Sequence, residues 1–232
     1  MKLIRLESTD SHYNMAFEQW CLTHLCPDEL YFYLWRNAPA VIIGENQDAE
    51  AEVNLEYLKA NGIALARRVT GGGAVYHDLQ NLNYSFVGRD ADPALMVEAL
   101  RKLGVPAELT GRNDIFVEGR KVSGYARRME GSNLLVHGTL MYDVDIDVLT
   151  RALDTPVSKL NRKGVQSVRS RVTNLKQYLP GIDSVEALKS ALLECFPCEC
   201  ERVLSSDELA QIDNLNNSVF STEAWIMRRE RP

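Results

Sequence analysis

Six stretches of the chain are rich in β-branched and aromatic residues, over lengths that are typical of β-strands. These stretches are residues 30–35, 40–44, 63–69, 82–87, 114–124 and 134–144. Together they predict a substantial β-sheet.

Helix signals lie between these strands. A helix that begins near Glu52 ends at the Asn61-Gly62 pair, because glycine is favoured just after the last helical turn. The Asp92-Pro93 pair opens a second helix, and Gly104 closes it.

Further helices are predicted near both ends of the chain. Asp183 with Glu186, and Ser205 with Glu208, have the spacing of a capping box. Residues 14–25 carry apolar side chains at helical spacing, and packing against the core explains that face without any function. The apolar face is formed by Met15, Phe17, Trp20, Cys21 and Leu25.

The order of these elements predicts the fold class. Strands dominate the first 145 residues and helices the last 90 or so, which indicates an α+β fold rather than regular βαβ alternation. The chain shows no repeat, low-complexity tract or obvious linker, and 232 residues can build one well-packed core. We therefore expect a single domain over residues 1–232.

Composition limits the classes of partner. A formal net charge of −6 does not indicate general affinity for nucleic acid or for anionic membranes. No apolar run approaches the roughly 20 residues that span a bilayer, and the N-terminus lacks a secretory signal. These features predict a cytoplasmic protein without nucleic-acid or membrane partners.

Five cysteines are too few and too clustered for a disulfide framework, so reduced thiols are expected. The Cys-x-x-Cys step at Cys195 and Cys198 resembles the start of a zinc or redox site. No second Cys or His pair follows it, since the last histidine is His137. The better interpretation is the end of a helix and the start of a strand.

The segment RRVTGGGAVYHDLQNLNYSF, residues 67–86, contains three consecutive glycines after two arginines. Glycine lets backbone N–H groups converge on an anion without interference from a Cβ atom. A phosphate would fit such a turn, with Arg68 as its cationic partner. The alternative is an ordinary β-hairpin turn, and neither common nucleotide-binding fingerprint is present.

Three downstream segments place further polar groups beside glycines. GRNDI at 111–115 puts Asn113 and Asp114 at the entry of a strand. GRKVSG at 119–124 brackets Lys121 and Ser123, which should face the same side by strand alternation. The segments HGTL (137–140) and KGVQSVRSRVTNL (163–175) add His137 and a basic, hydroxyl-rich stretch that is either a solvated loop or a mobile clamp over an anionic ligand.

In this order and spacing, the four segments resemble the catalytic domain of the lipoate-protein ligase A family, over nearly the whole chain. The resemblance implies a large mixed β-sheet flanked by helices, as in biotin ligases and class II aminoacyl-tRNA synthetases. It also implies ATP- and Mg²⁺-dependent activation of lipoate as lipoyl-AMP. The lipoyl group then passes to a lysine of the lipoyl domain of a 2-oxoacid dehydrogenase E2 subunit, or to the glycine-cleavage H protein.

The resemblance also assigns site residues. Lys121 is the implied catalytic residue, which bonds the lipoate carboxylate and the adenylate phosphate, and Asp114 is the implied Mg²⁺ ligand. The other implied ATP or adenylate contacts are Arg68, Gly73, Ala74, Val75, Tyr76, Asn113 and Asp114. The implied lipoate contacts are Gly71, Gly72, Gly73, Lys121, Ser123 and His137. The implied adenylate loop contains Lys163, Gly164, Val165, Ser167, Arg169 and Arg171, whereas His77 and Asp78 are interpreted as structural.

The sequence departs from two-domain ligases where it stops, at the point where their C-terminal accessory domain begins. Three alternatives follow: a ligase that uses a separate accessory small protein, a transferase that uses preformed lipoyl-AMP, and a single-domain enzyme that performs both steps. An octanoyl transferase of the same fold is a fourth, but no cysteine lies between Cys26 and Cys195 to act as its nucleophile. A non-catalytic lipoate-binding module ranks last, since the phosphate-binding and lysine groups are present.

Overall fold

The structure is a computed structural model that describes residues 1–111, 113–153 and 171–228. Its main feature is an eight-stranded sheet in the order β11-β1-β2-β6-β10-β9-β8-β7. The short β1 pairs in parallel with β2 and β11, and the other pairings are antiparallel, so the sheet is mixed. The strands are β1 (Lys2–Leu3), β2 (Tyr31–Trp35), β6 (Asn81–Val87), β7 (Ala107–Thr110), β8 (Asp114–Val117), β9 (Arg120–Glu130), β10 (Asn133–Met141) and β11 (Cys200–Glu201).

A second, three-stranded sheet has the order β4-β3-β5. Its central strand β3 (Ala40–Ile43) runs parallel to β4 (Ala64–Arg67) and antiparallel to β5 (Val75–His77). The glycine segment therefore does not join neighbouring strands, because β3 lies between β4 and β5. The hairpin alternative for this segment is wrong.

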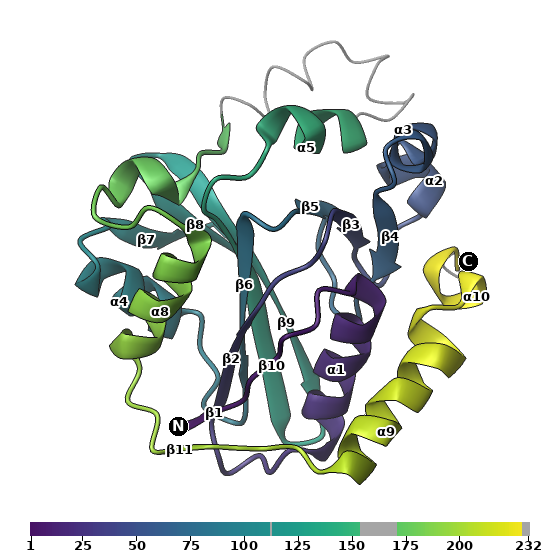
Figure 1. Cartoon of the computed structure of the whole chain (residues 1–232), viewed down its shortest axis with the longest axis horizontal. Coiled ribbons are helices and arrows are strands. Elements are labelled where there is room, and N and C mark those ends of the chain that lie inside the picture. The colour runs from purple at the N-terminus through teal and green to yellow at the C-terminus, as the bar shows by residue number, and fades with distance from the viewer. Residues whose placement is uncertain (112, 154–170, 229–232) are drawn as a thin grey trace.

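Helices cover both faces of the large sheet (Figure 1). One face packs against α4 (Ala94–Lys102) and α8 (Val185–Cys195), around a core that includes Phe32, Phe86 and Val136. The other face packs against α1 (Ser11–His24), which α9 (Ser206–Leu215) covers in turn. The remaining helical segments are α2 (Ala49–Glu52), α3 (Leu55–Ala60), α5 (Ile146–Ala152), η1 (Leu175–Tyr178), η2 (Asn216–Phe220) and α10 (Glu223–Ile226).

The predicted α+β class with a large mixed sheet is confirmed, but one predicted strand is two. The stretch 114–124 contains the β8–β9 hairpin, whose two turn residues are Glu118 and Gly119 with φ of 51° and 76°. Two consecutive positive φ angles are the geometry of a tight turn between antiparallel strands. The strand β7 and the helix α5 were not predicted from the sequence.

Helix boundaries follow their capping residues. Ser205 and Glu208 form the predicted capping box at α9. At α8 the N-cap is Ser184, whose hydroxyl accepts from the Ala187 N–H, so the predicted capping role of Asp183 is wrong. In place of the single helix expected from Glu52, the structure has two short helices, α2 and α3. The helix α8 ends at Cys195 and the strand β11 begins at Cys200, as predicted for this cysteine-rich segment. Across the described ranges, no helix has the length and apolar character needed to cross a membrane.

Candidate active site

A cavity of about 100 Å³, partly open to solvent, lies between the two sheets. A mainly apolar wall with a few polar groups is usual for a small-molecule site. The apolar and glycine positions of the wall are Met15, Trp35, Ile42, Gly72, Gly73, Ala74, Val75, Gly124, Tyr125, Ala126 and Gly138. The polar positions are Arg68, His77, Asn83, Asn113, Lys121, His137 and Thr139.

Of the 13 predicted site residues that the structure describes, eight line this cavity, although they come from distant parts of the chain. Those that line it are Arg68, Gly72, Gly73, Ala74, Val75, Asn113, Lys121 and His137. Gly71, Tyr76, Asp114 and Ser123 do not line it, and Arg171 is exposed at the start of the next described segment. Lys163, Gly164, Val165, Ser167 and Arg169 lie outside the described residues.

Lys121 brings an ammonium group to the wall of the cavity. Its Nζ lies 2.7 Å from Oδ1 of Asp114, and both side chains are about 30% exposed, at 31% and 28%. Gly124 makes room for the lysine, since a Cβ atom there would lie 2.9 Å from Lys121 Nζ. Asp114 thus holds the ammonium group in place through this ion pair, although Asp114 does not itself line the cavity.

The prediction that Ser123 shares a face with Lys121 is wrong. The register of β8 and β9 shifts between Ile115 and Phe116. Ile115 pairs with Ser123 and Phe116 pairs with Lys121, so Val122 has no partner on β8. Such a bulge interrupts strand alternation. Val122 and Ser123 are both fully buried, and Ser123 lies near enough to the Tyr84 hydroxyl to influence its pKa.

Tyr76 points away from the cavity because β5 alternates. Val75 and His77 line the cavity, whereas Tyr76 between them packs with Val41 and Leu58 in a separate core. Any contact between Tyr76 and a ligand in the cavity would therefore involve its backbone.

The described end of the 163–175 stretch reaches Lys121. Val172 forms a parallel bridge with Lys121, and the Thr173 N–H donates to the Lys121 carbonyl oxygen at 2.9 Å. This pairing fixes the point where the predicted adenylate loop meets the strand that carries the lysine.

The three consecutive glycines, residues 71–73, form a loop that we call the glycine loop. This loop crosses the end of β3, and the absence of a side chain at Gly44 lets the two backbones approach closely. A Cβ atom on Gly44 would lie 2.3 Å from the carbonyl oxygen of Gly72. Arg68 holds the loop from inside: Nη2 donates to the carbonyls of Gly71 and Gly73, each at 2.8 Å.

The other Arg68 donors also bind the protein. Nη1 donates to the Ile42 carbonyl at 3.1 Å and Nε to the Thr70 hydroxyl at 3.0 Å. Burial lowers the pKa of Arg68 to about 10. With these donors engaged, Arg68 acts as an anchor of the loop, and its predicted bidentate phosphate contact stays a prediction.

A buried hydrogen-bond chain connects this loop to α1. The Thr70 hydroxyl lies 2.8 Å from Nε2 of His137, and Nδ1 of His137 lies 2.7 Å from Oε2 of Glu18. The other Glu18 oxygen accepts from the Ser85 hydroxyl at 2.6 Å, and Ser85 accepts from Trp35 Nε1 at 2.9 Å. Because the carboxylate accepts only, Nδ1 of His137 carries a proton.

Sequence reasoning missed Glu18, which is 1% exposed. It lies on the apolar helix to which no function was assigned, and its carboxylate fixes the orientation of a cavity-lining histidine. A lone acidic residue within an apolar helical face was the available signal, since buried carboxylates need partners.

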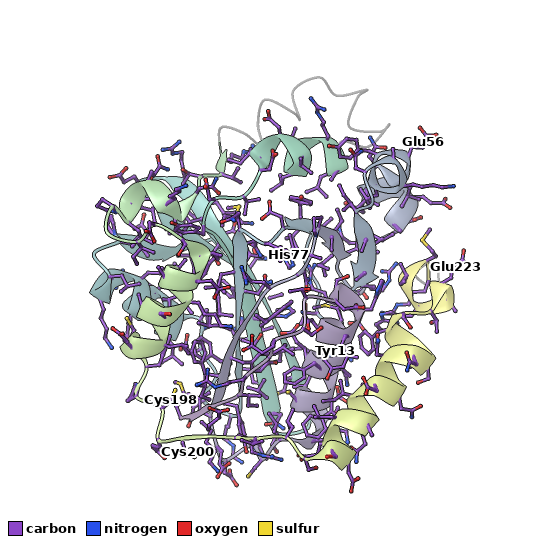
Figure 2. The ribbon with its side chains drawn as sticks, viewed as in Figure 1. Tyr13, Glu56, His77, Cys198, Cys200 and Glu223 are labelled. Atoms are coloured by element: carbon purple, nitrogen blue, oxygen red, sulfur yellow. The ribbon has the colours of Figure 1, made fainter. Side chains whose placement is uncertain are left out.

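His77, interpreted as structural from the sequence, lines the cavity instead. Figure 2 labels it in the interior, and β5 pairs with β3 beside it. Burial, together with the nearby Arg68 and His137, lowers the pKa of His77 to about 3. Its ring is therefore uncharged at neutral pH.

Known proteins with similar sequences are lipoate-protein ligases. Lipoate-protein ligase LplJ of Bacillus subtilis is 43% identical over 193 residues, which are 79% of this chain and 58% of that protein. Lipoate–protein ligase 1 of Staphylococcus aureus is 39% identical over 229 residues, 94% of this chain and 70% of that protein. The chain thus spans between about half and three quarters of the length of these relatives.

Solved structures agree over the whole fold. A bi-partite lipoate protein ligase from Thermoplasma acidophilum, described with its E2 lipoyl domain, matches with a TM-score of 0.85 and 31% identity, covering 100% of this chain and 97% of that one. A lipoate-protein ligase A bound with ATP matches with a TM-score of 0.83 and 31% identity, covering 97% and 98%. The family described as "Lipoyl protein ligase A/B catalytic domain" matches residues 10–197. The chain belongs to this family of lipoyl protein ligase catalytic domains.

Proposed function

We propose that the chain is the catalytic part of an ATP-dependent lipoate-protein ligase. It would join lipoate to AMP and then transfer the lipoyl group to a lysine of an acceptor domain. One observation carries the proposal: the Lys121 ammonium, held 2.7 Å from Asp114, lies in the wall of a mainly apolar cavity. The apolar wall suits the lipoyl chain, and the cation suits its carboxylate.

In the activation step, a carboxylate oxygen of lipoate attacks the α-phosphorus of ATP, and the bond to the departing pyrophosphate breaks. Both reactants are anionic, so catalysis depends on fixed positive charge where negative charge accumulates. Lys121 would supply that charge between the carboxylate and the α-phosphate. The backbone N–H groups of the glycine loop would bind phosphate oxygens.

Magnesium would have one carboxylate to bind here, Asp114, although Oδ1 of this residue pairs with Lys121 and its side chain does not line the cavity. Within the described residues, no group of three or more His, Cys, Asp or Glu side chains is placed to hold a metal ion. Proteins commonly hold Mg²⁺ through one or two carboxylates together with substrate phosphates. Asp114 would take this role, and the ion would neutralise charge on the polyphosphate.

In the transfer step, the neutral amine of an acceptor lysine attacks the carbonyl carbon of lipoyl-AMP. An amide bond forms, the carbon–oxygen bond to phosphate breaks, AMP leaves and the amine loses a proton. Lys121 would stabilise the departing phosphate. The ligase from Thermoplasma, described with its E2 lipoyl domain, supports a lipoyl domain as the acceptor; the H protein and a separate accessory protein remain predictions.

The thiol-dependent octanoyl transferase is disfavoured by the site. Within the described part of the cavity wall there is no cysteine, and Cys21 on α1 is buried with its pKa raised by burial. A buried thiol with a raised pKa is a poor nucleophile.

Mass spectrometry of an apo lipoyl domain tests the proposal. The chain is incubated with lipoate and MgATP, and in parallel with preformed lipoyl-AMP. Modification in both tubes identifies a ligase that completes both steps, whereas modification with lipoyl-AMP alone identifies a transfer half that needs an accessory polypeptide. An unmodified acceptor in both tubes would refute the proposed function.

Lys121 variants test the assigned role. Lys121→Ala should lower the rate of lipoyl-AMP formation by at least about 100-fold, which is typical when a preorganised electrostatic contact is lost. Lys121→Arg should also fail, because a planar guanidinium cannot replace a point charge between two oxygens. Near-normal turnover by either folded variant would exclude the role, with circular dichroism as the control for folding.

A further inference from the structure

Arg67 carries a buried charge that takes no part in the proposed chemistry. Its side chain is 1% exposed, and burial together with the nearby Arg228 lowers its pKa. Among the residues that the structure describes, no carboxylate forms an ion pair with this guanidinium, although Asp48 lies close enough to oppose part of that shift. Buried charges are normally paired, because an unpaired charge carries a large desolvation penalty. The role of Arg67 must therefore lie in the groups that it binds.

One nitrogen of the guanidinium binds the turn between β3 and α2, residues 44–47. Nη1 donates to three backbone carbonyls of this turn, at 2.7–3.0 Å. The turn in its place contacts the glycine loop. The Glu45 N–H donates to the Thr70 carbonyl at 2.8 Å, and Gly44 lies too close to the Gly72 carbonyl to carry a Cβ atom. A shift of the turn would therefore move the glycine loop.

The other two nitrogens bind the C-terminal segment, residues 223–228, which contains α10. Nε and Nη2 donate to its backbone carbonyls at 2.8–3.1 Å. The acceptors are the carbonyls of Trp225, Ile226 and Arg228. The last carbonyls of a helix have no partner within it, so Arg67 supplies donors that α10 itself lacks. Figure 1 shows α10 beside β4, the strand that carries Arg67.

Two further contacts hold the C-terminal segment in this position. Trp225 Nε1 donates to the backbone carbonyl of Arg67 at 3.0 Å. The Arg228 guanidinium lies 4.0 Å from the centroid of the Trp225 ring and donates to the Glu45 carbonyl at 3.1 Å. The segment and the turn are thus joined through the planar guanidinium of Arg67. A lysine could not replace it, because an ammonium has its three donors on a single atom.

Resting on the proposed function, we propose that Arg67 is a positioning residue for the activation step. It braces the turn at 44–47 against the C-terminal segment, and the turn fixes the glycine loop, whose N–H groups would bind phosphate oxygens. The C-terminal segment then belongs to the framework of the site, although none of its residues lines the cavity. Arg67 does not line the cavity either, so it acts only through the backbone of the loop.

Trp225→Ala perturbs this link from its far end. It removes the ring that anchors the C-terminal segment and leaves every residue of the cavity wall unchanged. Lipoyl-AMP formation should fall about 10–100-fold, as is usual for a small displacement within an active site. Trp225→Phe keeps the ring but loses the N–H donor, so its rate should lie between those of Trp225→Ala and the wild type. Arg67→Lys tests the guanidinium itself and should lower the rate as Trp225→Ala does.

Pyrophosphate release from lipoate and MgATP measures this rate on the full chain, at a temperature where circular dichroism shows each variant to be folded. Glu223→Ala, at an exposed position of the same helix (Figure 2), is the matched control and should keep the wild-type rate. A residue that only stabilised the fold would lower Tm and leave the rate of the folded enzyme unchanged. Wild-type rates in Trp225→Ala and Arg67→Lys would therefore overturn the proposal. Trp225→Phe carries the same comparison should the alanine variant fail to fold.

Nuclear magnetic resonance tests the link without any substrate. The amide resonances of Gly71, Gly72 and Gly73 should shift in Trp225→Ala and stay in place in Glu223→Ala. Unchanged glycine resonances in Trp225→Ala would overturn the link, and shifted resonances with an unchanged rate would overturn the positioning role. A wild-type chain that formed no lipoyl-AMP would refute the proposed function, whereas the glycine resonances would still decide on the link, which separates the two failures.

Discussion

Glu18→Ala tests whether the buried chain from α1 to the glycine loop contributes to stability. Glu18 accepts hydrogen bonds from Ser85 and His137 at 2.6 and 2.7 Å. Each buried donor left without an acceptor costs about 1–3 kcal/mol, so two donors together cost about 2–6 kcal/mol. The buried guanidinium of Arg68 also loses a nearby negative charge that raises its pKa.

A loss near the middle of this range, about 4 kcal/mol, should lower Tm by about 8–16 °C in a chain of this length. Glu18→Gln should cost less, about 1–3 kcal/mol, because its amide oxygen still accepts from one of the two donors. Urea unfolding followed by tryptophan fluorescence gives both free energies. Glu98→Ala, on the exposed side of α4, is the matched control and should change stability by less than about 0.5 kcal/mol.

Equal effects of Glu18→Ala and Glu98→Ala on the free energy of unfolding would refute a stabilising role for the Glu18 carboxylate. That result would mean that Ser85 and His137 find other partners, such as water, when the carboxylate is removed. A large effect of Glu18→Ala with an equal effect of Glu18→Gln would instead assign the stabilisation to charge alone.

Two further predictions follow from the site. In Gly124→Ala the new Cβ atom meets Lys121 Nζ at 2.9 Å, so the ammonium must move from Asp114. Adenylate formation should fall about 10–100-fold while Tm stays near the wild-type value, and unchanged activity relative to a Gly181→Ala control would contradict this. Burial lowers the pKa of His77 to about 3, so the unfolded chain takes up a proton near pH 6.5 that the folded chain excludes. Stability from neutral His77 is present above pH 6.5 and is lost as the pH falls toward 3, by up to about 1.4 kcal/mol per pH unit. Urea titrations between pH 4 and 6.5 should give a shallower slope for His77→Gln, and parallel slopes would argue against a buried neutral ring.

Local pattern determined much of the fold. The strands β2, β3 and β6 lie within one residue of the predicted stretches. β2 and β3 are buried runs of consecutive apolar residues, whereas β6 alternates polar and apolar side chains, which is the period of a strand. The hairpin inside 114–124 was missed because its two-residue turn, Glu118 and Gly119, is shorter than the strands that it joins. Strand pattern alone does not reveal such a break.

Chemistry visible along the chain also indicated much of the site. The glycine run, Lys121 and His137 stand out because glycines and polar residues within strands need a reason. The structure confirms that they meet in one cavity. Their resemblance to a family supplied the roles, which residue types by themselves leave open.

Only the tertiary structure decided which of two neighbouring residues faces the cavity. Arg68 holds the glycine loop, whereas Arg67 points the other way and donates to the backbone carbonyls of Gly44, Gln47 and Ile226, among others. Adjacent strand residues face opposite sides, but which side meets the cavity depends on how the two sheets pack. Glu18 and His137 are 119 positions apart, and their contact exists because α1 packs on the large sheet. The sequence determined which chemical groups are available, and long-range packing determined which of them face the ligand.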